Sequence, residues 1–186
     1  MTTATIDHEE IELFRSNARK FLEKEVLPHY DRWEKDGILP RSLWSALGEN
    51  GFLCVDVPEE YGGAGSVFRL SAVVVEEMTR LGFGALASNV SVHSDIVAPY
   101  ILHLGTAAQK QRWLPKMVTG EAVGAIAMTE PGAGSDLQGM KMKAEKHGDT
   151  YVLDGAKTFI TNGQHCDVVV MAAKTDPAAG GKGITL

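Results

Sequence analysis

Apolar residues recur at helical spacing at the start of the chain. They lie three or four residues apart and comprise Ile11, Phe14, Ala18, Phe21, Leu22 and Val26. This spacing places them on one face of an α-helix, which can be buried against a partner. Asp7 with Glu10 has the spacing of an N-terminal capping box, and Pro28 stops the run. The pattern predicts a helix between these two points.

Four further segments repeat the helical spacing. They run from Leu39-Pro40 to Gly51, from Val67 to Gly82, from Ala85 to Leu104, and from Thr106, which forms a second capping box with Gln109, toward Pro115. In the third segment the side chains expected to point inward are Ile96, Val97, Tyr100, Ile101 and Leu104. Val57–Gly65 is a turn between helices. The apolar faces are too broad for solvent-exposed arms, so these helices are predicted to pack as a bundle.

After Gly120 the period of the pattern changes from 3.6 to 2. The segments predicted as strands are Ala122–Met128, the alternating stretch around Met140–Glu145, Tyr151–Leu153, Ala156–Thr161 and Asp167–Lys174. Asp154-Gly155 lies between two of them and is typical of a hairpin turn. We therefore predict an α+β protein, with an all-α helical bundle at residues 1–120 and a small antiparallel β domain at residues 121–186.

The β pattern stops as a new alternation begins at Gly183–Leu186. A sheet that ended here would keep an open edge and an uncovered apolar face. The expectation is that this chain is a fragment and that its β domain is incomplete.

Composition and charge exclude several classes of protein. The 186 residues are 44% hydrophobic and 23% charged, as in globular proteins, and the net charge of −6 argues against a general nucleic-acid binder. No apolar run approaches the roughly 20 residues of a membrane helix. The N-terminus lacks the features of a signal or transit peptide, and the cysteines, Cys54 and Cys166, lie far apart. A soluble cytoplasmic protein is expected.

The segment Ala125–Gly139 is unusually rich in small residues. Gly132 and Gly134 allow a ligand to approach the backbone, and Ser135 adds a hydroxyl donor, as a phosphate requires. The segment matches neither a dinucleotide-binding glycine pattern nor a Walker loop. A surface turn between two strands is the alternative interpretation.

The segment Ala156–Gly163 places Phe159 and Thr161 on one face of the predicted strand. An aromatic ring and a hydroxyl on the same face can stack on a planar cofactor and donate a hydrogen bond to it. The alternative is a core phenylalanine beside an ordinary strand threonine.

Other polar residues give weaker signals. His93 and His103 lack further ligands at metal spacing, so no metal site is predicted, although His93 could line a pocket with Ser91 and Ser94. Glu130 is a candidate base only if buried, and a structural ion pair is the alternative. No residue stands out as a general base.

Three motifs together resemble the acyl-CoA dehydrogenase family. They are A-M-T-E-P-G-A-G-S-D-L-Q-G at Ala127–Gly139, G-A-K-T-F-I-T-N-G at Gly155–Gly163, and P-E-E-Y-G-G at Pro58–Gly63. The resemblance covers the whole chain. Within the family, the sequence is most similar to the long-chain and isovaleryl-type branches. It implies a C-terminal four-helix domain that these residues do not include.

The resemblance implies an FAD site. The residues that it assigns to the cofactor are Ile126, Met128, Thr129, Gly134, Ser135, Phe159, Ile160 and Thr161. By this likeness Thr129 lies near the pyrimidine side of the flavin, and Ser135 lies at the phosphate or the acyl-CoA substrate. Phe159 packs on the flavin face, and Thr161 hydrogen-bonds near N5, the atom that accepts hydride.

The resemblance also implies a reaction, the α,β-desaturation of fatty acyl-CoA thioesters in fatty acid β-oxidation. Electrons would pass to an electron-transfer flavoprotein, and the full-length enzyme would be a homotetramer. The glutamate base would come from the missing C-terminal domain, so we expect no catalytic base in this chain and no activity from it alone. The alternatives are a flavin oxidase or monooxygenase of the same fold, and a non-enzymatic helical binding module.

Overall fold

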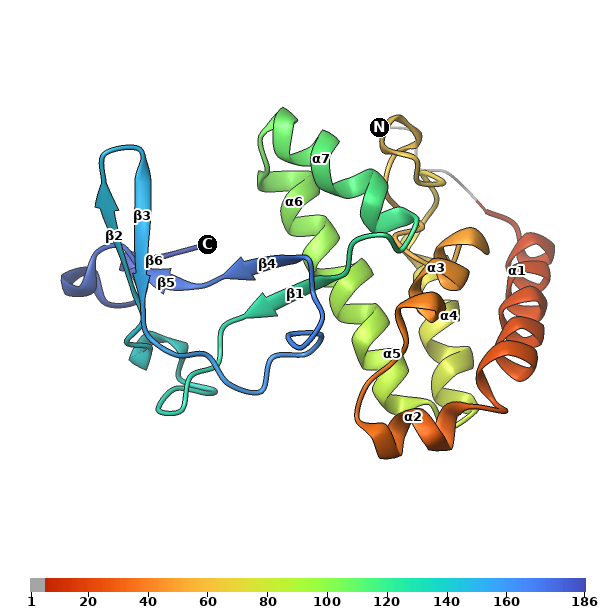
Figure 1. The fold of residues 1–186 in the computed structure, drawn as a ribbon. Helices are drawn as coiled ribbons and strands as arrows, with labels where there is room; N and C mark the ends of the chain where they lie inside the picture. Colours follow the sequence, from red (N-terminus) through yellow and green to blue (C-terminus); the bar gives the residue numbers. More distant parts are fainter. Residues whose placement is uncertain (1–5) are drawn as a thin grey trace. The chain divides into compact units, whose positions relative to one another are not determined.

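The computed structural model describes residues 6–186 and confirms the α+β class, with helices first and strands after them (Figure 1). The chain divides into two compact units, of which the first ends at Gly124 and the second comprises Ala125–Leu186. The helices of the first are α1 (His8–Phe21), α2 (Tyr30–Asp36), α3 (Arg41–Glu49), α4 (Phe68–Arg80), α5 (Gly84–Ser91), α6 (Ala98–Leu104) and α7 (Ala107–Val118).

Both predicted capping boxes are present. Asp7 Oδ1 accepts the Glu10 N–H at 2.8 Å, and Glu10 Oε2 accepts the Asp7 N–H at 3.2 Å. At α7 the side chains of Thr106 and Gln109 make the same reciprocal pair. The first helical run continues through a π-helical turn, Leu22–Val26, before Pro28. These helix starts are encoded locally, which is why the sequence predicts them well.

Two details of the helical prediction are wrong. The short helix α2 was not predicted, because seven residues are too few to show a period, although Tyr30 and Trp33 bury their side chains. Ile96 and Leu104, expected to point inward, are 37% and 72% exposed. A π-helical turn at Val92–Val97 separates α5 from α6, and its wider turn shifts the phase of the buried face.

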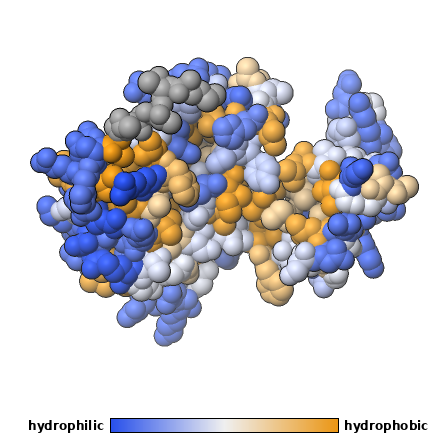
Figure 2. Space-filling view, turned by 180° about the vertical axis from the view of Figure 1, so that it is seen from behind, coloured by the Kyte–Doolittle hydropathy of each residue, from blue (hydrophilic) through white to orange (hydrophobic). Residues whose placement is uncertain are grey.

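The core of the helical unit consists of large side chains. Fully buried members include Leu22, Trp44, Leu47, Leu53, Met78, Leu86, Leu114 and Met117. Phe14 and Phe21 both meet Phe52 edge-to-face, with ring centroids 5.6 and 5.3 Å apart. The outer side formed by α1 is largely hydrophilic (Figure 2), so the amphipathic pattern of the sequence is realised as an inner and an outer face.

Glu77 on α4 joins that helix to α1 through Arg15 and Arg19, and it also pairs with Arg80 of its own helix. Its side chain is only 1% exposed, and it accepts contacts from Arg15 at 3.0 Å, Arg19 at 2.8 Å and Arg80 at 3.1 Å. The Arg19 guanidinium contributes most to holding the pKa of this carboxyl down, to about 2, against the opposing effect of burial.

His93 holds the segment that leads out of the helical unit. Its Nε2 donates to the carbonyl of Met117 at the end of α7, and its Nδ1 accepts the N–H of Gly124, each at 3.0 Å. The ring is fully buried, and burial lowers its pKa to about 4. His93 is therefore a neutral structural residue rather than part of an open pocket.

The second unit contains two sheets. One pairs β1 (Gly124–Ala127) with β4 (Val168–Met171); the other has the order β3 (Thr150–Asp154), β2 (Lys143–His147), β5 (Ala173–Lys174) and β6 (Ile184–Thr185). The pairs β2–β3 and β5–β6 are antiparallel, whereas β2 and β5 pair in parallel, so this sheet is mixed. Its small core has Ala133, Met140 and Ala172 at the centre.

The predicted hairpin turn is wrong. β2 pairs with β3 from Lys143↔Asp154 to His147↔Thr150, so the turn is Gly148-Asp149. Gly148 has a φ of +61°, which supplies the left-handed conformation that a two-residue turn needs. Asp154 ends β3, and Ala156–Thr161 forms no strand.

No helix within residues 6–186 combines the length and apolar character that spanning a membrane would demand.

Candidate functional site

The two motif segments of the β unit lie side by side. The Thr158 N–H donates to the carbonyl of Thr129 at 3.0 Å, and the Lys157 ammonium donates to the carbonyl of Met128 at 2.9 Å. The fold therefore brings together residues that are almost 30 positions apart in sequence. All eight residues predicted to contact the cofactor lie on these segments or on the adjoining strand and loop.

A tight turn separates the first segment from its glycine-rich loop. Glu130 and Ala133 exchange backbone hydrogen bonds at 2.9 and 3.1 Å, and Gly134 and Ser135 follow, both exposed. A Cβ added at Gly134 would meet nothing within 4 Å, and its φ is not left-handed. The loop leaves its backbone accessible, as a bound phosphate or ribose would require.

Phe159 lies in an irregular turn rather than on a strand, so the predicted shared strand face with Thr161 is wrong. Its φ is +54°, and Asn162 is also left-handed at +65°. Two non-glycine residues in this conformation within four positions indicate a locally strained backbone. The Phe159 side chain is 94% exposed. A large apolar ring held outward in a strained turn is typical of a surface that a ligand covers.

The remaining predicted residues are partly accessible. Ile126, Met128, Thr129, Ile160 and Thr161 are all half-buried. Met128 also packs against the Ala133–Met140 core, so one side of this segment anchors it while other atoms remain available. The arrangement suits a planar, partly apolar ligand that bears hydrogen-bonding groups.

Glu130 and Lys157 form a buried ion pair that the sequence left unresolved. Each side chain is 6% exposed, and Lys157 Nζ lies 3.0 Å from Glu130 Oε1. Glu130 also accepts the N–H groups of Lys141 at 2.6 Å and Met142 at 3.0 Å. Burial would raise the pKa of Glu130, but these N–H donors and the Lys157 ammonium outweigh it and hold the pKa below its usual value.

This saturation makes Glu130 a structural ion partner rather than a base. Its carboxylate oxygens already accept two backbone N–H groups and an ammonium. The sequence signal for the pair was an acidic residue, Glu130, in one motif and a basic residue, Lys157, in the other.

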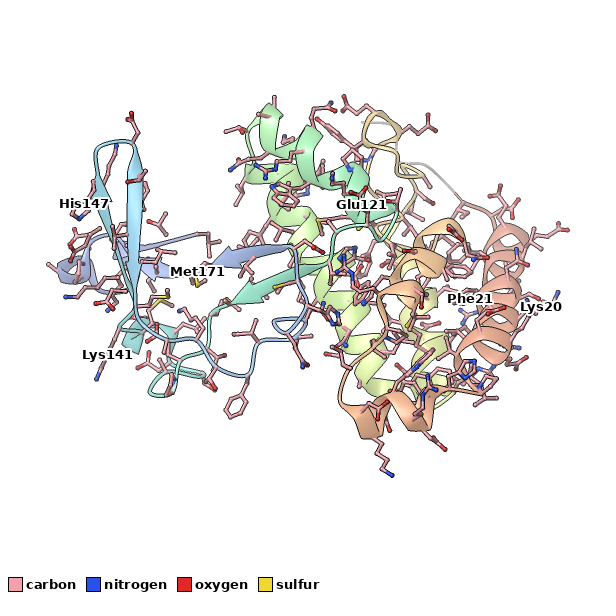
Figure 3. All side chains as sticks on the ribbon, viewed as in Figure 1. Lys20, Phe21, Glu121, Lys141, His147 and Met171 are labelled. Atoms are coloured by element: carbon pink, nitrogen blue, oxygen red, sulfur yellow. The ribbon has the colours of Figure 1, made fainter. Side chains whose placement is uncertain are left out.

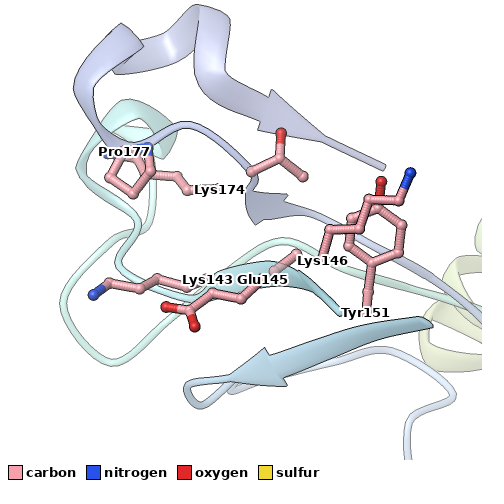
Figure 4. Close-up of a pocket in the computed structure, with 8 residues that line it drawn as sticks. Lys143, Glu145, Lys146, Tyr151, Lys174 and Pro177 are labelled. Atoms are coloured by element: carbon pink, nitrogen blue, oxygen red, sulfur yellow. The ribbon is translucent and has the colours of Figure 1, made fainter. Parts of the chain in front are cut away.

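Two surface depressions lie in the β unit. One, of about 330 Å³, is lined by Glu130, Pro131, Gly132, Lys141, Met142, Lys143, Asp154, Gly155 and Ala156. The other, of about 430 Å³, is lined by residues of β2 and β3 on one side and by Lys174, Thr175 and Pro177 on the other (Figure 4). In the latter the ammonium groups of Lys143 and Lys146 point to different sides, with the Glu145 carboxylate nearby, so the lysines do not converge on one anion. Figure 3 shows how Lys141, His147 and Met171 are spread over this unit.

Residues 6–186 contain neither an activated cysteine thiol nor a group of side chains suited to bind a metal ion. Burial raises the pKa of the Cys54 thiol to about 12, and burial also raises the pKa of Cys166, so neither thiol is activated. In this part of the chain no three His, Cys, Asp or Glu side chains group as a metal site would need.

Both units of the chain match domains of one known protein family. Residues 8–121 match the N-terminal domain of acyl-CoA dehydrogenases, and residues 125–186 match the middle domain. The long-chain specific acyl-CoA dehydrogenase of Sus scrofa mitochondria is 44% identical over 170 residues, which are 91% of this chain and 39% of that protein. Isovaleryl-CoA dehydrogenase of Arabidopsis thaliana mitochondria is 42% identical over 174 residues, 92% of this chain and 42% of that protein.

Solved structures agree with this fold. An acyl-CoA dehydrogenase from Geobacillus kaustophilus is 53% identical and superimposes with a TM-score of 0.92 over the whole of this chain and 48% of its own. The chain thus spans about two fifths to one half of the length of the relatives it matches. It belongs to the acyl-CoA dehydrogenase family and comprises the N-terminal and middle domains of that family.

Proposed function

We propose that the complete protein is an FAD-dependent acyl-CoA dehydrogenase that introduces an α,β double bond into a fatty acyl-CoA thioester. The observation that carries the proposal is the exposed Phe159 ring next in sequence to the Thr129–Thr158 contact, in the unit that also holds an accessible glycine loop and the half-buried Thr161. A glutaryl-CoA dehydrogenase from Mycobacterium smegmatis solved with FADH2 supports it, at 30% identity and a TM-score of 0.85.

The residues of this chain would bind and orient the flavin, which supplies the hydride acceptor when it is bound. Phe159 would cover one ring face, and Thr161 and Thr129 would donate hydrogen bonds to its polar edge. Gly134 and Ser135 would receive the phosphate part or the acyl-CoA. Ile126, Met128 and Ile160 would complete the apolar wall.

The base that removes the α-proton would come from outside these 186 residues. Within the described residues, Glu130 was the one carboxylate that the sequence singled out as a candidate base, and it is already saturated by hydrogen bonds. We therefore propose that this chain alone is inactive and that a glutamate of the C-terminal domain completes the site.

Partners and substrate follow from the same proposal. The acyl-CoA would be a long straight chain or an isovaleryl-type branched chain, consistent with the relatives most similar in sequence. Electrons would pass to an electron-transfer flavoprotein, and the enzyme would be a cytoplasmic homotetramer acting in lipid β-oxidation. A glutaryl-CoA dehydrogenase solved with glutaryl-CoA, 34% identical to this chain, supports the thioester class.

Anaerobic stopped-flow reduction of the complete flavoprotein tests the function. Long-chain or isovaleryl-CoA should bleach the flavin absorbance, and reoxidation should require an electron acceptor. Thr161→Val should retain FAD but slow reduction about ten- to a hundredfold, since one hydrogen bond to the reacting system is lost. Rapid reoxidation by oxygen would favour an oxidase, and a colourless protein would favour a binding module; either result contradicts the proposal.

A further inference from the structure

Three separate segments of the β unit meet on one buried carboxylate. Glu130 follows Met128 and Thr129 directly, and its side chain binds the backbone at Lys141 and Met142 and the ammonium of Lys157. Along the chain, the glycine-rich loop separates the first stretch from the second, and the β2–β3 hairpin separates the second from the third. The carboxylate thus fixes where the glycine-rich loop leaves the strand, relative to the start of β2 and to the Phe159 segment.

Lys157 also binds the segment that contains Glu130 at a second point. The same ammonium that binds Glu130 Oε1 also donates to the carbonyl of Met128 at 2.9 Å. Its two acceptors flank Thr129, whose own carbonyl accepts the Thr158 N–H. Thr129 is therefore held at both neighbours and at its own backbone by residues 157 and 158.

The residues proposed to contact the flavin begin at this junction. On one segment they are Met128 and Thr129, and on the other Phe159 starts two positions after Lys157, with Thr161 two further on. A displacement of the Lys157 ammonium would change the distance between Thr129 and the Phe159 turn. An ammonium in an almost fully buried site, paired with a carboxylate and a carbonyl, has little freedom to move.

We propose that Glu130 and Lys157 are a positioning pair that holds the two flavin-contacting segments, Met128–Thr129 and Phe159–Thr161, at the separation the flavin requires. This inference rests on the proposed function, because it assigns the pair a role at the flavin site. Neither residue touches the reacting atoms. The pair acts through Thr129 and Phe159.

The test uses the complete flavoprotein with Lys157→Met and Glu130→Gln, each close in size to the native residue. Both variants should bind FAD at least about tenfold more weakly and give an altered visible circular dichroism spectrum of the bound flavin. Flavin reduction by acyl-CoA should slow. The effect of Thr161→Val on reduction should be smaller in the Lys157→Met background than in the wild type, because the threonine is already misplaced.

A matched control is Lys116→Met. Lys116 pairs with Glu121 at 2.7 Å, but both side chains are exposed and lie in the helical unit. This variant should leave FAD affinity, the flavin spectrum and the reduction rate unchanged. Weaker FAD binding by Lys116→Met would show that the loss of any lysine–glutamate pair weakens FAD binding. That result would overturn the positioning role of Glu130 and Lys157.

Lys157→Arg keeps the proposal testable if the other variants do not fold. Arginine preserves the charge, but its planar guanidinium cannot reproduce both contacts of the ammonium, so the flavin spectrum should still change. Flavin properties equal to wild type in Lys157→Arg or Lys157→Met, even with a lower melting temperature, would overturn the positioning role. Failure of all three to fold would assign the pair to folding alone. If the wild type neither binds FAD nor is reduced, the proposed function fails instead.

Discussion

The two units of the chain are stabilised in different ways. The helical unit buries large side chains such as Trp44, Leu47 and Met78 completely. The β unit has a core of small and flexible residues, and on β3 three consecutive apolar side chains, Tyr151 to Leu153, remain about half exposed. The side chains of its Glu130–Lys157 ion pair are almost fully buried. Packing therefore determines the helical unit, whereas hydrogen bonds and one ion pair shape the unit that carries the proposed site.

The largest expected effect comes from removing apolar volume in the helical core. Leu47→Ala should reduce the free energy of unfolding by about 2–5 kcal/mol, because Leu47 is fully buried and leaves a cavity. Val152→Ala on β3 should change it by less than about 0.5 kcal/mol. Urea unfolding of the complete protein measures both. Equal losses in the two variants would contradict the difference between the units.

The next effect tests Glu77, a buried carboxylate of the helical unit that three arginines share. Glu77→Gln should lower the free energy of unfolding by at most about 3 kcal/mol, since the pKa of Glu77 lies near 2 instead of its usual 4.5. The stabilisation is complete above pH 4.5 and is lost as the pH falls from there toward 2. Glu76→Gln, which removes an exposed partner of Arg15, should cost much less.

Acid unfolding curves of wild type and Glu77→Gln give the measurement. The variant should be less stable near neutral pH, and its curve should approach that of the wild type as the pH falls below 4.5. A constant difference down to pH 2 would mean that Glu77 is not held ionised by its arginines.

His93 gives a smaller effect in a different pH window. It is buried and neutral, so its pKa of about 4 lies below the usual 6.5, and the unfolded chain takes up the proton first. The contribution of the neutral His93 to the free energy of unfolding is complete above pH 6.5. It falls as the pH drops toward 4, and the loss is about 2 kcal/mol at a pH near 5. His93→Gln should remove this slope from the stability curve, whereas the exposed His103→Gln should retain it.

How much the sequence predicted depends on how local each interaction is. Each of the capping boxes at Asp7 and Thr106 joins residues three positions apart, so these two helix starts were predicted correctly. The prediction that Ile96 is buried was wrong, because the spacing of apolar residues does not reveal a π-helical turn. The hairpin failed because Asp154-Gly155 and Gly148-Asp149 are both good turns, and only pairing across the strands selects one.

The candidate site divides in the same way. The residues of the two motifs came from their resemblance to a family, and the fold places them side by side. The strained turn at Phe159 and the contact of Lys157 with Glu130 were not predictable, because one depends on backbone conformation and the other joins positions 27 residues apart. Period and propensity describe neighbours along the chain, whereas a site of this kind is made by contacts across it.

The smallest effect on stability, and the most selective for function, is expected at Gly134. Alanine there meets nothing within 4 Å and needs no left-handed φ, so Gly134→Ala should change the free energy of unfolding by less than about 0.5 kcal/mol. If the flavin or its phosphate contacts this backbone, the added methyl group should still weaken FAD binding, by about tenfold. Gly84→Ala is the matched control, since Gly84 also has nothing within 4 Å and no left-handed φ but lies at the start of α5 in the helical unit. FAD titration of the complete apoprotein compares the two. Wild-type affinity in Gly134→Ala would leave the loop as an ordinary surface turn, and the accessible backbone of the β unit would then need another explanation.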